Sequence, residues 1–375
     1  MSSTTIAAPR IFDGRDFLPA GLVRIENGRV AGITSDSPPA GAIRLPPGTT
    51  LAPGLLDLQV NGGGGLLLND SIDADCMRAI AAAHAAYGTT GVLPTLISGT
   101  RAMVRAALAA AQAAQGAPGV LGVHIEGPFL SPQRPGMHPP ARLVPLEEAD
   151  VAMFAGHGAP VLLTLAPERA PPALLAALAR AGIVLFAGHT NANEAQAQAA
   201  FDGPIVGCTH LFNAMPPFLS REPGIVGAAM AHGSVRAGII CDGVHVHPAA
   251  VRAAWRAMGP DRLFLVSDCM STAASTLTSY TWENETVTLQ DGVLRLANGS
   301  LAGSAATLAE CVQRAVTLAH LPLGDALRMA TATPAAVLGR SDIGHIAPGT
   351  RADLVALDAD LSVIGVWQEG VKLSK

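Results

Sequence analysis

Several short apolar runs of this chain end in residues that can hold a metal ion or move a proton. VHIE contains His124 and Glu126, FAGHT contains His189, and CTH ends at His210. One carboxylate and two histidines from three successive runs would form a three-ligand site with an open position for water, the form of a catalytic zinc site. Asp268 follows a further apolar run, LFLVS, in the same way.

Each of these residues also has a structural interpretation. A single histidine at a strand end is often a hydrogen-bonded core residue rather than a ligand. An unpaired buried carboxylate is costly, so Glu126 and Asp268 are harder to explain in this way. The segment CDGVHVHP places Asp242, His245 and His247 after another apolar run. Five histidines outside these runs are interpreted as structural or solvated: His84, His157, His232, His320 and His345.

The segment LDLQVNGGGG raises a different question. Gln59 and Asn61 have the i, i+2 spacing that places two side chains on the same face of a strand. Two histidines at these positions would suggest metal ligands, but side-chain amides are neutral and bind transition metals poorly. The four glycines that follow could be no more than a flexible turn.

The elements that carry these residues alternate regularly. Short apolar runs and alanine-rich helical stretches repeat between residues 51 and 340, a pattern typical of a (β/α)₈ TIM-like barrel, whose strands all end at the functional face. A doubly wound sheet is the alternative, although no GxGxxG opens a helix. Residues 1–50, with a hairpin turn at Asn27-Gly28, and residues 341–375 look like short strands, which predicts one small β-sandwich domain built from both termini.

Composition excludes several classes of protein. Of the 375 residues, 49% are hydrophobic and 14% are charged, so a large core can form. The net charge of −5 without a basic block argues against nucleic acid or an anionic membrane as partner. No apolar run approaches the ~20 residues of a membrane span, and no secretory signal is evident. Five scattered cysteines predict reduced thiols in a cytoplasmic protein.

The lysines restrict the chemistry further. The only two are Lys372 and Lys375, at the end of the chain. A Schiff base, a P-loop lysine and a carbamylated lysine between two metals are therefore all excluded from the body of the protein.

Eight ordered motifs carry a resemblance to a known family. LAPGLLDLQVNGGGG, HIEGPFLSPQRPGMHPP, AGHTNA, THLFNAMPPF, SREPGIVG, CDGVHVHP, LVSDCM and LAGSAATL are similar to the N-acetylglucosamine-6-phosphate deacetylases of the amidohydrolase superfamily. Some of these deacetylases carry Gln-x-Asn where many amidohydrolases carry His-x-His. The resemblance implies that Gln59 and Asn61 mark a vestigial first metal position. It also implies one divalent metal ion per chain, Zn²⁺ or else Fe²⁺ or Co²⁺, held by Glu126, His189 and His210.

The resemblance also implies a mechanism. A metal-bound water with its pKa lowered toward ~7 would supply hydroxide to attack the acetamide carbonyl. Asp268 would take the proton of the water and return it to the departing amine. His245 or the metal would stabilise the oxyanion. The expected products are acetate and glucosamine 6-phosphate.

Substrate contacts follow from the same motifs. Arg221 of SREPG resembles the phosphate-binding arginine of the family, although a solvated loop charge is the alternative. Other expected contacts to the sugar phosphate, the sugar and the acetyl group are Met137, His138, Asn213, Ala214, His245, Leu301, Ala302 and Gly303. SPQRPGMHPP has Arg-Pro where relatives often have lysines, so sugar specificity could differ. The resemblance further suggests a homodimer, in which a phosphate contact could cross the interface.

Three readings remain open at this stage. The first is a deacetylase of N-acetyl-D-glucosamine 6-phosphate or of its galactosamine epimer. The second is another amidohydrolase that acts on a cyclic amide or an N-acyl amino acid, and such an enzyme would not need Arg221. The third is a catalytically silent barrel with a binding or regulatory role, which would have no need to keep Glu126, His189, His210 and Asp268 together.

Overall fold

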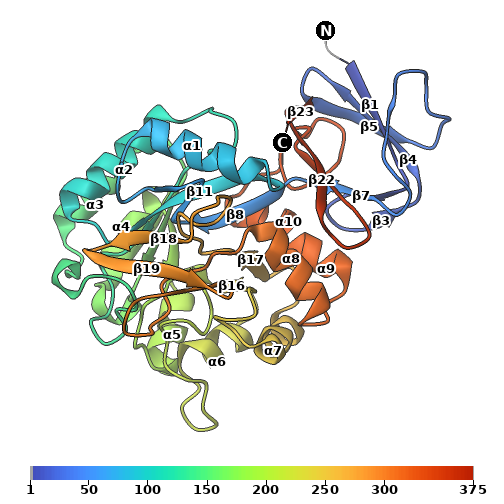
Figure 1. Ribbon diagram of the computed structural model, residues 1–375. Helices are drawn as coiled ribbons and strands as arrows, with labels where there is room; N and C mark the ends of the chain where they lie inside the picture. Colours follow the sequence, from blue (N-terminus) through green and yellow to red (C-terminus); the bar gives the residue numbers. More distant parts are fainter. Residues whose placement is uncertain (1–2, 375) are drawn as a thin grey trace.

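Eight parallel strands form the central sheet in the computed structural model, which describes residues 3–374 (Figure 1). Neighbouring strands in the sheet follow the order of the chain. The strands are β8 (Leu55–Val60), β11 (Thr89–Ile97), β12 (Val123–Glu126), β13 (Val161–Leu165), β14 (Val184–Ala187), β15 (Gly207–Cys208), β16 (Arg236–Ile240) and β17 (Leu263–Val266). Their residues are almost all buried, as expected for parallel strands with helices outside and side chains inside.

The first and last strands meet and close the sheet. Val60 and Cys269 form a parallel bridge, and the backbone nitrogen of Asp268 donates to the carbonyl of Gln59 at 3.0 Å. The (β/α)₈ barrel predicted from the sequence is therefore confirmed, and the doubly wound sheet is wrong.

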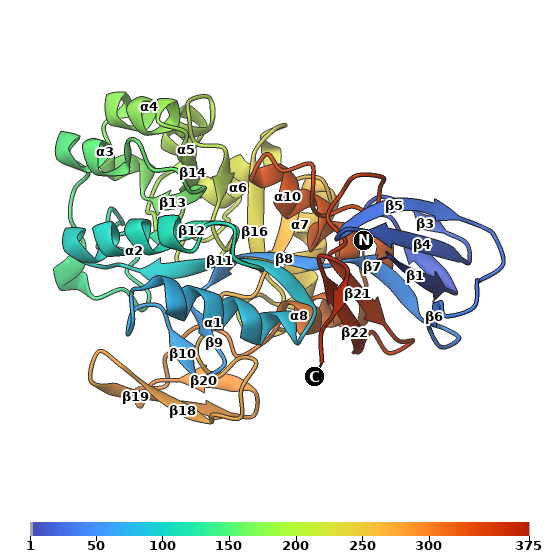
Figure 2. The same ribbon diagram turned by 90° about the horizontal axis from the view of Figure 1, so that it is seen from above.

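Helices surround the barrel on the outside (Figures 1 and 2). They are α1 (Ala74–Ala85), α2 (Arg101–Ala113), α3 (Glu148–Phe154), α4 (Pro172–Arg180), α5 (Glu194–Phe201), α6 (Gly224–Ala231), α7 (Pro248–Met258), α8 (Leu308–Thr317), α9 (Leu323–Met329) and α10 (Ala332–Val337), with short 3₁₀ turns at Pro140–Arg142 and Pro167–Arg169. The alanine-rich segments predicted as helices are α2 and α4. Within residues 3–374, no helix combines the length and the apolar character needed to cross a membrane.

The interior of the barrel is filled by apolar side chains below the functional end. Leu58, Leu93, Leu162, Phe186 and Phe264 belong to one buried cluster. The rings of Phe186 and Phe264 lie 6.1 Å apart in an edge-to-face arrangement. This packed plug supports the polar residues at the strand ends.

Two further sheets, built from both ends of the chain, form a separate lobe (Figure 2). One contains β5 (Arg29–Thr34), β4 (Gly21–Glu26), β1 (Ser3–Ala8) and β6 (Ile43–Arg44); the other contains β23 (Val371–Lys372), β22 (Val363–Gln368), β21 (Leu354–Leu357), β7 (Thr50–Pro53), β2 (Arg10–Phe12) and β3 (Phe17–Leu18). Ile6, Val23, Leu51 and Trp367 share one core cluster, so the sheets pack as the predicted sandwich. Asn27 and Gly28, with φ of 51° and 78°, make the predicted hairpin turn. Division of the chain at residues 50 and 340 stays a prediction, and β7 spans the first of these points.

A small antiparallel sheet is inserted after the last barrel strand. It contains β18 (Ser279–Trp282), β19 (Glu285–Gln290) and β20 (Val293–Arg295), and Figure 2 shows it beside α1 and the short hairpin of β9 (Gly62–Gly63) and β10 (Leu66–Leu67). Trp282 and Val287 pack in one cluster with Met270 and Ile97. The insertion therefore rests on the end of the barrel where the strands finish.

Candidate active site

The candidate residues stand at the carboxyl ends of four barrel strands. Glu126 is the last residue of β12, and His189, His210 and Asp268 lie two residues beyond β14, β15 and β17. The backbone φ angles of these last three residues are 46°, 30° and 49°, in the left-handed region that residues other than glycine rarely adopt. Such backbone costs about 1–3 kcal/mol per residue and persists where the surrounding structure imposes it. The strand-end loops thus turn three side chains toward one point.

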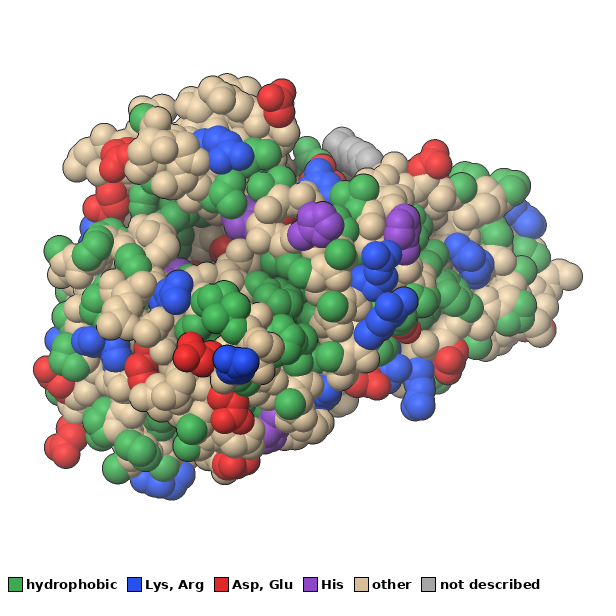
Figure 3. Space-filling view, turned by 90° about the horizontal axis from the view of Figure 1, so that it is seen from below, with side chains coloured by type: hydrophobic (Ala, Val, Ile, Leu, Met, Phe, Trp, Pro, Cys, Tyr) green, Lys and Arg blue, Asp and Glu red, His purple; other side chains and the backbone are tan. Residues whose placement is uncertain are grey.

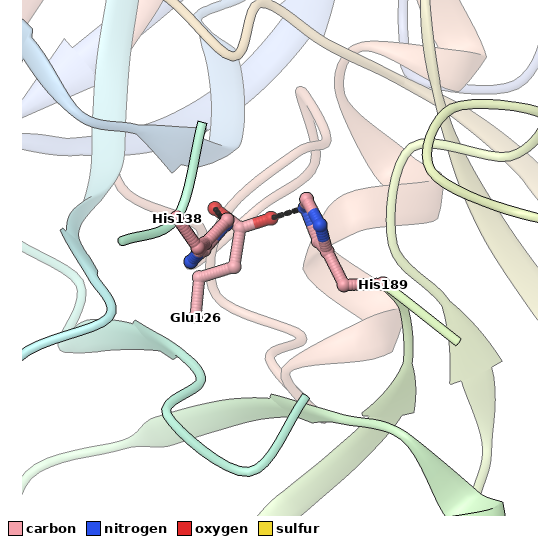
Figure 4. A group of neighbouring side chains, drawn as sticks. All are labelled: Glu126, His138 and His189. Atoms are coloured by element: carbon pink, nitrogen blue, oxygen red, sulfur yellow. Dashed lines mark ion pairs between the residues drawn. The ribbon is translucent and has the colours of Figure 1, made fainter. Parts of the chain in front are cut away.

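Glu126 and the histidines converge closely. Glu126 Oε1 lies 2.8 Å from His210 Nε2 and 3.3 Å from His189 Nε2, and the two histidine nitrogens are 3.0 Å apart. His138 Nε2 approaches the other carboxylate oxygen at 3.9 Å. Figure 4 shows Glu126 between His138 and His189, a group whose ligand atoms lie close enough to hold one metal ion. His138, expected from its motif among the substrate contacts, therefore lies beside the expected ligands.

Neighbouring groups fix the ring orientations. His189 Nδ1 lies 2.9 Å from the carbonyl oxygen of Arg134. A carbonyl only accepts, so Nδ1 carries the proton, and in the neutral ring Nε2 presents a lone pair to Glu126 and His210. His138 Nδ1 pairs in a similar way with the hydroxyl of Ser98 at 2.7 Å. Outer hydrogen bonds of this kind are typical of histidine metal ligands, and the donor set fits a divalent ion.

The electrostatic environment favours a charged carboxylate in this cluster. Burial opposes the charge on Glu126, but the adjacent rings of His189 and His210 hold its pKa well below the usual value. Burial and the nearby His189 lower the pKa of His138 well below that of a free histidine, which keeps it neutral. Neutral imidazole and ionised carboxylate are the forms that bind metal.

His124 has a different role from the one its position at a strand end allowed. Its Nε2 lies 2.7 Å from the hydroxyl of Thr164, which in turn pairs with Thr209, inside the barrel. Burial lowers the pKa of His124 to about 4. It is a neutral, hydrogen-bonded core residue below the cluster.

Gln59 and Asn61 face the carboxylates of the site as hydrogen-bond donors. Gln59 Nε2 lies 3.0 Å from Glu126 Oε1 and 3.1 Å from Asp268 Oδ1, and Asn61 Nδ2 lies 2.7 Å from the same Asp268 oxygen. The i, i+2 spacing on β8 therefore does place both amides on the face that points to the site. Burial, and then the charge of Glu126, raise the pKa of Asp268 to about 6. A carboxylate in this range can exchange a proton near neutral pH.

His245 stands at the edge of the same hollow and is held by Asp242. Its Nδ1 lies 2.6 Å from Asp242 Oδ2, while Asp242 Oδ1 accepts from the backbone nitrogens of Val244 and His245. Burial opposes the charge of Asp242, but the His245 hydrogen bond is the main contribution that keeps the pKa of this carboxyl below its ordinary value. His247, by contrast, caps α7 by accepting from the nitrogen of Ala249 and takes no part in the site.

A hollow of about 170 Å³ contains these groups. In Figure 3, histidine and acidic atoms are visible inside a depression of the face that is drawn. Most of the expected substrate contacts line the hollow, together with Asn61, Glu126, His189, His210 and Asp268: Met137, His138, Asn213, Ala214, His245, Leu301 and Gly303. Ala302 does not; its side chain is fully buried, and its carbonyl accepts the hydroxyl of Tyr280.

Arg221 lies outside this hollow. It is exposed and borders a second hollow of about 590 Å³ together with Arg134 and Asn191. Within the single chain described here, the structure does not bring the expected phosphate contact to the metal cluster.

The first three of the four glycines after Asn61 are required by close packing or by their backbone conformation. A side chain at Gly63 would come within 2.3 Å of His84 Nε2, and one at Gly62 within 2.1 Å of the carbonyl of Leu66. Gly64 has a φ of 62°. The segment is therefore a tight hairpin packed against α1, which fixes the end of β8, and the flexible-turn interpretation is wrong.

Some residues that support the site were missed from the sequence. Ser98 directly follows the apolar run GVLPTLI, and its place at a strand end was a usable signal. Arg134 acts through its carbonyl oxygen, which the sequence does not reveal. Trp282 donates to the carbonyl of Met137 at 3.3 Å and holds the loop that carries His138; its distance of 145 residues along the chain leaves no local signal.

A barrel with a Glu–His cluster at its strand ends and a neighbouring carboxylate defines a metal-dependent hydrolase architecture. Residues 50–373 match the amidohydrolase family. The chain belongs to this family, whose members depend on metal ions.

Several relatives and solved structures are similar to this chain over most of its length. The chain is 39% identical to the N-acetylgalactosamine-6-phosphate deacetylase of Shewanella sp. over 96% of this chain and 95% of the relative. It is 32% identical to the N-acetylglucosamine-6-phosphate deacetylase of Haemophilus influenzae over 86% of each. Its fold is similar to the N-acetylglucosamine-6-phosphate deacetylase of Pasteurella multocida, with a TM-score of 0.95, 28% identity and full coverage of both chains. The structure of a variant of the N-acetyl-D-glucosamine-6-phosphate deacetylase of Mycobacterium smegmatis, in complex with N-acetyl-D-glucosamine-6-phosphate, is also similar. Its TM-score is 0.94 and its sequence identity 33%, with full coverage of both chains.

Proposed function

We propose that this chain hydrolyses the acetamide of N-acetyl-D-glucosamine 6-phosphate to D-glucosamine 6-phosphate and acetate. The observation that carries the proposal is the position of Asp268, a proton acceptor, in the same hollow as the Glu126–histidine cluster. The names of the relatives support a phosphorylated N-acetyl amino sugar as the substrate class. The proposed reaction would belong to the breakdown and recycling of amino sugars.

Glu126, His189 and His210 are the proposed metal ligands, with His138 next to them. A divalent ion held there, which we propose to be Zn²⁺, would act as a Lewis acid and lower the pKa of bound water toward ~7. The donors would also accept Fe²⁺ or Co²⁺.

The protein's own groups then have separate tasks. Asp268 Oδ1 is occupied by the two amides, and Oδ2 receives no hydrogen bond from residues 3–374, so Oδ2 is the atom proposed to take the water proton and return it to the leaving nitrogen. His245, whose Nδ1 donates to Asp242, can in its protonated form donate from Nε2 to an oxygen that becomes negative at the edge of the hollow. Met137, Asn213, Ala214, Leu301 and Gly303 are proposed to enclose the sugar.

The galactosamine epimer is a second candidate substrate. The Shewanella relative at 39% identity acts on N-acetylgalactosamine 6-phosphate, as its name states. We propose that loops around the hollow, including the Arg-Pro segment of SPQRPG, distinguish the two epimers.

One assay separates these proposals. Purified protein is incubated with both N-acetylated sugars, each with and without the 6-phosphate, and released acetate is measured. We expect hydrolysis of at least one phosphorylated sugar and at least tenfold lower kcat/KM without the phosphate. Release of acetate from none of the four would reject the deacetylase proposal and favour the cyclic amide or N-acyl amino acid alternatives. The homodimer expected from the resemblance is tested on the same preparation by light scattering.

A further inference from the structure

The amides of Gln59 and Asn61 engage one oxygen of Asp268 and spare the other. Both donate to Oδ1, at 3.1 and 2.7 Å, and within residues 3–374 no donor reaches Oδ2. Each amide belongs to a residue that is only 2% exposed. Hydrogen bonds from buried donors to a carboxylate are shorter and stronger than neutral pairs. The carboxylate is therefore held in one rotation, with a single oxygen available to the hollow.

The backbone makes this contact stiff. Asp268 N donates to the Gln59 carbonyl at 3.0 Å, and Asn61 N donates to the Cys269 carbonyl at 3.0 Å, across the line where β8 meets the segment after β17. The Asn61 carbonyl also accepts from Leu68 at 3.0 Å. The amide donors and the Asp268 acceptor thus lie on two segments that are hydrogen-bonded to each other through their backbones. They cannot separate unless the barrel opens at this seam.

Asn61 also bears a cost that an apolar residue would avoid. Its Oδ1 is buried and finds no hydrogen-bond partner among the described residues, 3–374. A buried acceptor without a partner costs about 1–3 kcal/mol. The value of an amide at this position therefore lies in its donor group, whose hydrogen bond within residues 3–374 goes to Asp268.

We propose that Gln59 and Asn61 are positioning residues for Asp268, rather than idle remnants of a metal site. They hold Oδ1 so that Oδ2 faces the reacting water and the leaving nitrogen. Gln59, which also bonds Glu126, keeps the two carboxylates at a fixed separation. The kinetic consequence rests on the proposed deacetylase function, whereas the geometric consequence does not.

Asn61→Leu tests the proposal, because leucine keeps the size of the side chain and removes the donor. We expect kcat on the sugar phosphate to fall about 10–100-fold, part of the contribution of a positioned general base. KM should stay within about threefold and bound metal should remain at the wild-type level. Gln368→Leu is the matched control: this amide donates to the carbonyl of Thr90 at 3.2 Å, remote from the hollow, and its loss should leave kcat unchanged.

A double variant distinguishes positioning from general damage. If Asn61 acts through Asp268, Asn61→Leu should cause no further loss of kcat in an Asp268→Asn background, since coupled effects do not add. Additive losses, or a wild-type kcat in Asn61→Leu alone, would overturn the proposal. A crystal structure of Asn61→Leu supplies a reading that does not depend on the substrate: a carboxylate of Asp268 rotated from its wild-type position supports the proposal, and an unmoved one contradicts it.

Discussion

His189 Nε2 and His210 Nε2 lie 3.0 Å apart, and both are close to the same oxygen of Glu126. The carbonyl of Arg134 fixes the proton of His189 on Nδ1, so in the neutral ring its Nε2 offers a lone pair to this point. Two lone-pair donors and a carboxylate oxygen repel one another unless a positive centre lies between them. In the protein without metal, a proton on His210 can supply this positive charge. A divalent ion bound between the three atoms would supply more of it.

Metal content is the first prediction. Gln59 and Asn61 turn their donor groups to the carboxylates, so a second cation next to Asp268 would meet amide hydrogens. We expect about one tightly bound divalent ion per chain, and loss of activity on chelation that zinc restores. Elemental analysis of the fully loaded protein gives the count. Two ions per chain, with activity following the second, would contradict the one-metal proposal.

Asp268→Asn separates proton transfer from metal binding. The substitution keeps the shape of the side chain and removes its basicity, while Glu126, His189 and His210 remain. We expect turnover to fall by about 10²–10⁴-fold, the usual contribution of a positioned general base. Metal content and turnover are measured on the same preparation. Near-normal turnover would remove Asp268 from the mechanism, and loss of metal with partial rescue by excess zinc would make it a ligand.

Arg221→Ala tests phosphate recognition. The side chain is exposed and lies outside the hollow of the metal cluster, so this prediction comes from the sequence motif alone. If Arg221 binds phosphate in the functional assembly, binding of the phosphorylated sugar should weaken by about 2–4 kcal/mol, the range for truncating a buried charged pair. Turnover of bound substrate should change little.

The unphosphorylated sugar is the control for this variant, because its kcat/KM should not respond. An unchanged KM for the phosphorylated sugar would show that Arg221 is a surface charge. Arg236→Ala, on barrel strand β16, offers a comparison for general effects of losing an arginine.

The pH dependence of stability follows from Asp57. This carboxyl is fully buried on β8 and accepts from the backbone nitrogens of Gln59 and Ser267. Burial raises its pKa from 3.8 to about 7. Below pH ~4 the Asp57 carboxyl is protonated in both the folded and the unfolded chain, so it does not change the free energy of unfolding with pH. Between pH ~4 and 7 only the unfolded chain releases this proton, so stability falls as the pH rises. The full loss above pH 7 is about 4 kcal/mol.

Asp57→Asn should remove this dependence, since an amide does not titrate. Urea unfolding at several pH values measures the free energy of unfolding of both proteins. The free energy of the wild type minus that of the variant should fall steadily between pH ~4 and 7. Asp75→Asn, an exposed carboxyl on α1, should show no such trend. A constant difference between wild type and Asp57→Asn would mean that Asp57 is charged in the folded protein.

The barrel and the strand-end residues could be predicted from the sequence because both depend on local patterns. Parallel barrel strands are buried on both faces and appear as short apolar runs, and their ends mark the functional face. Glu126, His189, His210 and Asp268 were found in this way, and the structure brings them together.

Tertiary structure alone decided the contacts across segments. Closure of β8 against the segment after β17 turns the amides of Gln59 and Asn61 into donors for Asp268, which spacing along β8 cannot show. The insertion that carries Trp282 holds the loop that brings His138 to Glu126.

One physical reason explains why the sequence predicts the barrel but not the contacts between distant segments. Apolar periodicity is written within a few residues and determines which segments become strands and helices. The direction of a polar side chain at a strand end depends on loops and insertions that arrive from far along the chain. The sequence therefore determined the barrel and its candidate chemistry, whereas packing between distant segments decided which donor meets which carboxylate.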